Sequence, residues 1–197
     1  MKKYFMKQAI LEIAADLFAK YGYDAVSMND MAKKLKITKP ALYYHFKGKR
    51  EIYLESLNQV IEAHKKRLEE AIATKGSVEE KLRRFSIAHI GVHSAKDSSR
   101  FVPFIREISR KDKKILNFLT NKKEEMFEII EPLMEEVIEK NGKNSRFVDA
   151  RMISMMFMGA MNSFIADKML YGKSEWTPEM VADQIVNLFF IEKGELV

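Results

Sequence analysis

The sequence predicts an all-α protein, and three observations support this prediction. Apolar residues recur at helical spacing along most of the 197 residues, and no segment shows the strict alternation of a half-buried strand. Helix start signals and glycine-containing stops separate the periodic stretches. The apolar content of 47% is ample for a hydrophobic core and argues against disorder.

The first part of the chain predicts two helices joined by a short loop. The first helix extends from about Tyr4 to Tyr21, and Gly22 is a plausible stop because glycine readily takes the left-handed geometry found there. The second helix, from Met28 to about Leu35, begins after Ser27. Together with Asp30, three residues later, Ser27 forms a capping pattern.

A third, short helix begins at Thr38 or Lys39, where Pro40 fits only the first turn because it has no N–H. A tight turn separates it from the second helix, so the pair forms a helix-turn-helix unit. A helical wheel places Leu42 and Phe46 on the inward face. The outward face carries Pro40, Ala41, Tyr43 and Tyr44. Two exposed tyrosines between lysines favour contact with a polyanion, and DNA is our hypothesis.

The positive charge of the chain is confined to this same region. Residues 1–50 contain 11 basic and 4 acidic residues, a net charge of +7. The other 147 residues contain 23 basic and 24 acidic residues, a net charge of −1. This asymmetry is typical of a nucleic-acid-binding module attached to a neutral domain. Chance clustering of surface lysines is the alternative.

The remaining residues predict a larger helical region. A long helix from Lys49 to about Thr74 is followed by a capping box at 77–80, which opens a helix ending near Ala95. Further helices are expected to start at 97–99 and to cover about 115–140, 146–171 and 178–192. Pro132 should kink or divide the helix that contains it, because an interior proline costs about 3 kcal/mol.

The run TKPALYYHFKGK at 38–49, together with Ser27, Met31-Ala32 and Ile52, resembles the N-terminal signature of the TetR family of bacterial transcriptional regulators. The match covers about residues 10–55, and beyond it only the number and length of helices agree. The resemblance implies a homodimeric repressor that binds a pseudo-palindromic operator and is released by a small hydrophobic effector. Residues 1–48 would be the helix-turn-helix DNA-binding domain. Residues 49–197 would be the effector-binding and dimerisation domain, with the dimer interface in the last two helices.

The same resemblance assigns DNA-binding positions in the recognition helix and on its flanks. These are Ser27, Lys36, Thr38, Lys39, Pro40, Ala41, Tyr43, Tyr44, His45 and Lys49. Because Pro40 and Ala41 offer no side-chain donors, Lys39 is the best candidate for reading a guanine, and DNA shape would supply the rest.

Lys36 is the one departure from the family pattern in this segment. The family commonly has glycine in the turn between the two helices. If the backbone there is left-handed, a lysine costs about 1–2 kcal/mol relative to glycine. In return, Lys36 adds a positive charge next to the duplex.

The resemblance places an effector pocket between the fifth and eighth helices. The predicted effector-binding residues are Phe85, His89, Phe104, Phe127, Met158 and Asn162. Each of them could instead belong to an ordinary core. The helix with methionines at 152, 155, 156, 158 and 161 is apolar almost all round over 152–160, which predicts burial on two sides, as at a dimer seam.

Other functional classes find little support. His89, His93 and Asp97 share one helical face and could hold a metal, but histidines in a polar pocket are the simpler interpretation, so no metal or cofactor is expected. Catalytic motifs such as G-x-S-x-G, HExxH and a P-loop are absent, and so are cysteines. An architectural DNA-binding protein without an effector is the main alternative, and a metal-dependent enzyme that uses the face of His89, His93 and Asp97 is a further one. No signal peptide or membrane span is recognisable, and a cytoplasmic location is expected.

Overall fold

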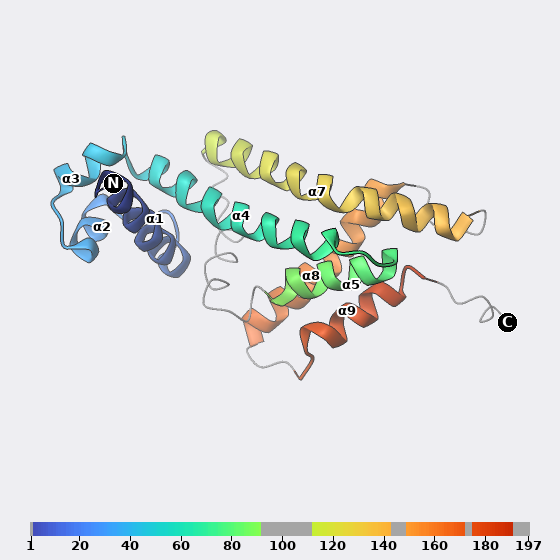
Figure 1. Cartoon of the computed structure of the whole chain (residues 1–197). Helices are drawn as coiled ribbons and strands as arrows, with labels where there is room; N and C mark the ends of the chain where they lie inside the picture. Colours follow the sequence, from blue (N-terminus) through green and yellow to red (C-terminus); the bar gives the residue numbers. More distant parts are fainter. Residues whose placement is uncertain (1, 92–111, 143–148, 172–174, 191–197) are drawn as a thin grey trace. The chain divides into compact units, whose positions relative to one another are not determined.

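The computed structural model describes residues 2–91, 112–142, 149–171 and 175–190. Within these ranges the chain forms helices and no strand, which confirms the all-α prediction (Figure 1). The helices are α1 (Lys2–Tyr21), α2 (Met28–Leu35), α3 (Lys39–His45), α4 (Lys49–Ala73), α5 (Val78–Gly91), α7 (Lys113–Asn141), α8 (Ala150–Tyr171) and α9 (Pro178–Asn187). The helix expected to start at 97–99, and the expected end near Ala95, lie outside the described residues. None of the described helices is long and apolar enough to cross a bilayer.

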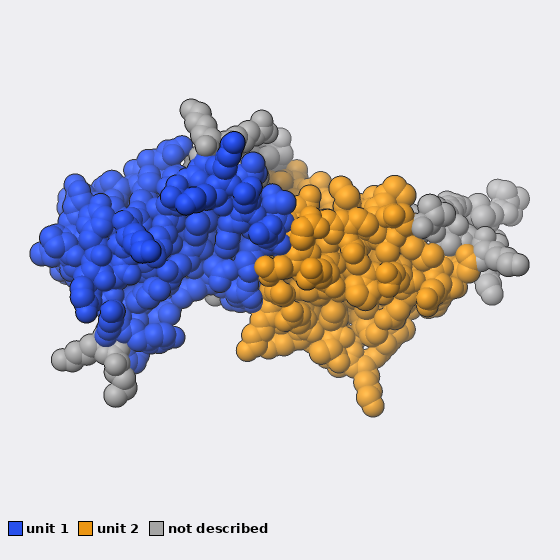
Figure 2. All heavy atoms as spheres, turned by 90° about the horizontal axis from the view of Figure 1, so that it is seen from above, with its two compact units in different colours: residues 1–63, 95–122 blue, residues 64–94, 123–197 orange. Residues whose placement is uncertain are grey.

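The chain divides into two compact units, which Figure 2 shows in different colours. Unit 1 comprises residues 1–63 and 95–122, and unit 2 comprises residues 64–94 and 123–197. Helices α4 and α7 therefore contribute residues to both units. The packing does not change at residue 48, because Ile52, Tyr53 and Leu57 on α4 are buried in the same core as α1 to α3. The division of function between residues 1–48 and 49–197 stays a prediction.

A single hydrophobic core holds the helices of unit 1 together. Ile10, Ala14 and Phe18 form the buried stripe of α1, at the spacing that the sequence predicts. Leu42 and Phe46 are fully buried in this core, which confirms the inward side of α3. Since these side chains occupy one face of α3, its other face is left to solvent.

The predicted capping pattern sets the start of α2. The backbone N–H of Asp30 donates to Ser27 Oγ at 3.2 Å, and the N–H of Ser27 donates to Asp30 Oδ2 at 2.8 Å. The Ser27 hydroxyl donates to the same carboxylate oxygen at 2.5 Å. These hydrogen bonds, the one from the hydroxyl first, lower the pKa of Asp30 below its ordinary value. The capping box thereby fixes the first turn of the helix that supports α3.

Lys36 ends α2 in the left-handed conformation, with φ 55° and ψ 39°. Its N–H donates to Lys33 O at 3.2 Å, and the N–H of Ile37 donates to Ala32 O at 3.0 Å. This pair of bonds is the Schellman motif, in which glycine normally occupies the position of Lys36. Among the described residues, Lys36 is the only non-glycine residue with a positive φ.

Replacing Lys36 with glycine is expected to raise the free energy of unfolding by about 0.5–1 kcal/mol. Glycine removes the clash between Cβ and the carbonyl oxygen, and its greater freedom in the unfolded chain offsets part of that gain. Urea denaturation of K36G and K36A provides the measurement. K36A loses the charge but keeps the Cβ atom, so equal stabilisation by both variants would contradict this explanation.

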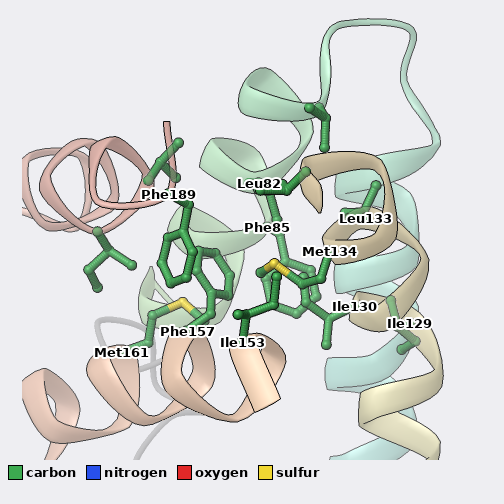
Figure 3. Packing of buried hydrophobic residues seen from close by; sticks show 14 of the residues in the cluster. Leu82, Phe85, Ile129, Ile130, Leu133, Met134, Ile153, Phe157, Met161 and Phe189 are labelled. Carbon is green, nitrogen blue, oxygen red and sulfur yellow. The ribbon is translucent and has the colours of Figure 1, made fainter. Parts of the chain in front are cut away.

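Unit 2 is built around aromatic and aliphatic side chains from α5, α7, α8 and α9 (Figure 3). Phe157 of α8 lies at its centre, with its ring centroid 6.1 Å from that of Phe85 and 5.5 Å from that of Phe189. Ile153 and Met161, one turn away on either side, point the same way and are fully buried. Helix α8 thus has a continuous apolar stripe that faces its neighbours.

Pro132 does not divide α7, contrary to one of the two outcomes expected from the sequence. The helix is continuous from Lys113 to Asn141 with Pro132 inside it. The neighbouring residues Ile129, Ile130, Leu133 and Met134 are all buried in unit 2. Burial of such side chains contributes about 1.5–3 kcal/mol each, which outweighs the cost of about 3 kcal/mol for the proline.

Candidate nucleic-acid interface and a buried histidine pair

Helix α3 presents its aromatic and basic side chains to solvent. Tyr43 and Tyr44 expose 50% and 69% of their surface, although tyrosine side chains are usually largely buried. Lys39 and Pro40, in the first turn, are also exposed, whereas Ala41 and His45 are half-buried. The ring of His45 packs edge-on against that of Tyr44, with the centroids 5.1 Å apart. Of the four residues that the helical wheel places outward, Pro40, Tyr43 and Tyr44 are exposed, and Ala41 is half-buried.

The turn before α3 adds further polar groups to this surface. Lys36 and Thr38 are both exposed. Thr38 is the N-cap residue of α3, but its hydroxyl makes no capping hydrogen bond, so the hydroxyl is free to contact a ligand. Ser27 is exposed as well, but its hydroxyl already donates to Asp30. Of the predicted phosphate-contacting groups, Thr38 is thus better placed to donate than Ser27.

Lys49 has an additional role that the sequence does not indicate. Its ammonium donates to the backbone carbonyl of Tyr23 at 2.8 Å and lies 4.2 Å from the centroid of the Tyr23 ring. The first residue of α4 is thereby tied to the loop that precedes α2. A lysine ammonium has three donors, so this bond leaves donors for a phosphate.

A chain of hydrogen bonds in unit 2 links α4, α5 and α8. His64 Nε2 lies 3.0 Å from His89 Nδ1, and His89 Nε2 lies 3.1 Å from Asn162 Oδ1. Because an amide oxygen only accepts, His89 carries its proton on Nε2 and His64 donates to its other nitrogen. Both histidines are 2% exposed, whereas Asn162 is exposed. The chain therefore connects the interior of unit 2 to its surface.

Sequence reasoning selected His89 and Asn162 but missed His64. The available signal was its position on α4, where His64 continues the stripe formed by Leu57, Ile61 and Leu68. Both ring nitrogens of His89 have protein partners, so His89 has none left to bind a metal as it stands. His93 and Asp97 lie outside the described residues.

The other predicted effector residues fall into three groups. Phe85 and Phe127 are buried in the core of unit 2, where the Phe85 ring stacks on that of His89 at 6.2 Å between centroids. Met158 is half-buried against the same core. Phe104 lies outside the described residues. Among the predicted effector residues that the structure describes, only Asn162 is exposed and bonded to a buried polar group.

Burial lowers the pKa of His89 below its ordinary value, and the hydrogen bond to Asn162 opposes this effect only in part. Between the lowered pKa and about 6.5, the unfolded chain binds a proton that the folded chain does not. The free energy of unfolding should therefore fall as the pH drops from 7.5 to 5.5. One such group contributes at most about 1.4 kcal/mol per pH unit.

Urea denaturation at pH 7.5 and pH 5.5 checks this expectation in H89Q and N162A. H89Q removes the titrating group, so its loss of stability over this interval should be smaller than that of the wild type. N162A keeps the buried imidazole and should show a loss at least as large as the wild type. An undiminished loss in H89Q would contradict the assignment to His89.

Helix α8 carries methionines on both of its faces. Met161 is fully buried, whereas Met152, Met155 and Met156 each expose about half of their surface at 49%, 52% and 55%. These three lie on one side of the helix because they are separated by a single turn. On α9, which packs against α8, Met180 is also exposed, and so is Leu188, the residue directly after the helix. Among the residues that the structure describes, those packed against α8 leave this methionine side of the helix exposed.

Comparison with known proteins gives a match in the N-terminal region. Residues 10–55 match the family described as bacterial regulatory proteins, tetR family. Over 52 residues the chain is 44% identical to the biofilm operon icaADBC HTH-type negative transcriptional regulator IcaR of Staphylococcus aureus (strain Newman). The matched segment covers 26% of this chain and only 28% of that relative.

Solved structures match over nearly the full length. A TetR/AcrR-family transcriptional regulator from Thermobifida fusca superposes with a TM-score of 0.67 at 22% identity, covering 98% of this chain and 99% of its own. AibR in complex with isovaleryl coenzyme A and operator DNA gives a TM-score of 0.73 at 19% identity, covering 92% and 96%. At these identities the likeness concerns the fold. Together, the comparisons identify residues 10–55 as a helix-turn-helix domain of the bacterial tetR family, in a chain with the fold of TetR/AcrR regulators.

Proposed function

We propose that the protein is a ligand-responsive transcriptional repressor that binds a pseudo-palindromic operator as a homodimer. The observation that carries the proposal is the outward face of α3, where Tyr43 and Tyr44 are exposed within a segment of net charge +7. Such a surface combines positive charge with exposed aromatic rings and is complementary to DNA phosphates. The relative IcaR is named as a negative transcriptional regulator, which favours repression over activation.

The proposed contacts divide into those that read bases and those that hold the backbone. Lys39, at the start of α3, is placed to reach a guanine, since the first residues of a recognition helix contact base edges. Lys36 and Thr38 are placed to contact phosphates and set the register of the helix. Tyr43 offers a hydroxyl to a phosphate or a ring to a thymine methyl group.

The remaining positions of the proposed interface serve close approach and support. Pro40 and Ala41 have small side chains that let α3 lie close to the duplex. Tyr44, His45 and Lys49 flank the same surface, and Ser27 supports it by holding the first turn of α2.

The proposed dimer interface lies on α8 and α9. The exposed methionines of α8 leave an apolar surface that a second copy of the same helix would cover. Methionine adapts its shape to an irregular partner and therefore suits a seam between two identical helices. In a dimer that binds DNA, the two α3 helices would enter major grooves about 34 Å apart.

The proposed effector is a small hydrophobic molecule that contacts unit 2. Asn162 would form its polar contact because it is exposed, and His89 would support that contact by holding the Asn162 side chain from the buried side. Phe85, Phe104, Phe127 and Met158 complete the proposed apolar contacts. The effector would favour a state in which the two α3 helices no longer match the spacing of the grooves. AibR, which shares the fold, was crystallised with both isovaleryl coenzyme A and operator DNA.

Measurements on the full chain of its binding to DNA, its mass in solution and its response to small molecules test this proposal. Selection from a random duplex library should yield a sequence with two inverted half-sites, and a mobility shift should favour it over a scrambled duplex. Light scattering should give twice the chain mass of 23.0 kDa. A monomer with no sequence preference would refute the proposal. A thermal-shift screen of hydrophobic and cationic small molecules, followed by release of the duplex, tests the effector.

A further inference from the structure

The first two turns of α1 continue its buried stripe with lysines. Lys3, Lys7, Ile10 and Ala14 follow one another at helical spacing on the same side of the helix. Ile10 and Ala14 are fully buried, Lys7 is half-buried and Lys3 is exposed. Followed toward the N-terminus, the stripe therefore leads from the core of unit 1 to solvent. Its two outermost positions, Lys7 and Lys3, carry positive charge.

These two lysines lie over aromatic residues at the C-terminal end of α3. Lys3 Nζ is 4.9 Å from the centroid of the Tyr44 ring, and Lys7 Nζ is 5.2 Å from that of Phe46. In Figure 1 the N-terminal end of α1 lies near α3, in agreement with these contacts. The N-terminus of α1 thereby adjoins the exposed face of α3.

The two lysines differ in the partners of their ammonium groups. Lys7 pairs with Glu55 of α4 at 2.6 Å, so much of its charge is neutralised. Lys3 forms no ion pair with any residue that the structure describes, and the ring of Tyr44 is its only charged or aromatic contact there. An exposed ammonium over a tyrosine face gains only about 0.5–1 kcal/mol, which leaves its charge available to a phosphate.

We propose that Lys3 contacts a DNA phosphate next to the groove that α3 occupies, so that the interface extends beyond the helix-turn-helix unit. This inference rests on the proposed function of the chain. Its basis is continuity of the two surfaces, since Lys3 and Tyr44 touch, and charge complementarity, since Lys3 has no carboxylate partner among the described residues. Lys3 lies outside the segment that matches the family, which begins at residue 10.

Lys20 offers a matched control at the other end of the same helix. Its ammonium lies 5.0 Å from the centroid of the Tyr21 ring, and both residues are exposed, as are Lys3 and Tyr44. It is separated from Lys3 by 17 residues of α1, or about 25 Å along the helix axis. K3Q and K20Q therefore remove the same charge from the same kind of contact, but only K3Q removes it beside α3.

The experiment measures duplex affinity of the full-length wild type, K3Q, K3R and K20Q by fluorescence anisotropy between 0.05 and 0.3 M salt, roughly the range in which phosphate contacts are resolved. The probes are the duplex selected from the random library and a scrambled duplex. A lost phosphate contact lowers the slope of log K against log salt by about 1 per protomer and the affinity by about tenfold near 0.1 M salt. K3Q should show both losses on both duplexes, whereas K3R and K20Q should behave as the wild type.

The outcomes separate this inference from the proposed function. If the wild type binds with sequence preference and K3Q matches K20Q, the phosphate contact is overturned while the proposed function stands. A loss of affinity in K3Q with an unchanged salt slope also overturns it, because Lys3 would then only position Tyr44. If the wild type binds neither probe, the proposed function itself fails, and this inference with it.

Discussion

Replacing Met156 with glutamate is expected to prevent formation of the proposed dimer and to lower the affinity for a two-half-site duplex by about 10²- to 10⁴-fold. Met156 is 55% exposed in a single copy, so the variant chain can fold without burying the new charge. In the proposed dimer, the two glutamates would be desolvated next to each other, which costs several kcal/mol. Without the dimer, each half-site is bound independently and the advantage of linkage is lost.

Light scattering and anisotropy on the selected duplex measure the two parts of this expectation. Circular dichroism checks that M156E keeps its helical content. L116E is the matched control, because Leu116 on α7 is also an exposed apolar residue, at 38%, but lies on neither α8 nor α9. L116E should remain dimeric and bind DNA normally. A dimeric M156E with unchanged affinity would exclude this face of α8 from the interface.

Replacing Phe157 with alanine is expected to lower the free energy of unfolding by about 3–5 kcal/mol. The ring is fully buried at the centre of unit 2, between Phe85 and Phe189. Its removal takes away the transfer free energy of the ring and leaves a cavity that the surrounding helices only partly fill. The edge-on arrangement with Phe189 adds about 0.5–1.5 kcal/mol to the loss.

Urea denaturation at a fixed protein concentration measures this loss, since the stability of a dimer depends on concentration. Phe5 provides a control of the same residue type, because it is 66% exposed. F5A should change the free energy of unfolding by no more than about 0.5 kcal/mol. A loss below about 1 kcal/mol in F157A would mean that unit 2 rearranges to fill the space.

The sequence was most informative where a single residue determines the local backbone. Ser27 with Asp30 marked the start of α2, where the N–H of Asp30 donates to Ser27 Oγ at 3.2 Å. Lys36 was expected to be costly if its backbone is left-handed, and its φ of 55° in a Schellman turn meets that condition. Each of these features depends on neighbours within a few positions of the chain.

The sequence was less informative where burial or hydrogen bonding depends on residues that are distant in the chain. Met156 and Met161 occur in the same apolar helix, and only the packing of α5 and α9 against α8 makes one exposed and the other buried. The hydrogen bond between His64 and His89 joins two residues that lie 25 positions apart in the chain, on two different helices. Pro132 was expected to kink or divide α7, and it does not divide it because the surrounding core compensates locally. Spacing along one helix cannot reveal such partners.

The contact of the Lys49 ammonium with the carbonyl and ring of Tyr23 fixes the start of α4 within unit 1. Lys49 begins α4, and Ile52 and Tyr53, in the next turn, are buried in the core that also encloses Leu42 of α3. The opening turns of α4 therefore share a core with α3, and we expect a displacement of that end of α4 to be transmitted to α3 through these packed side chains.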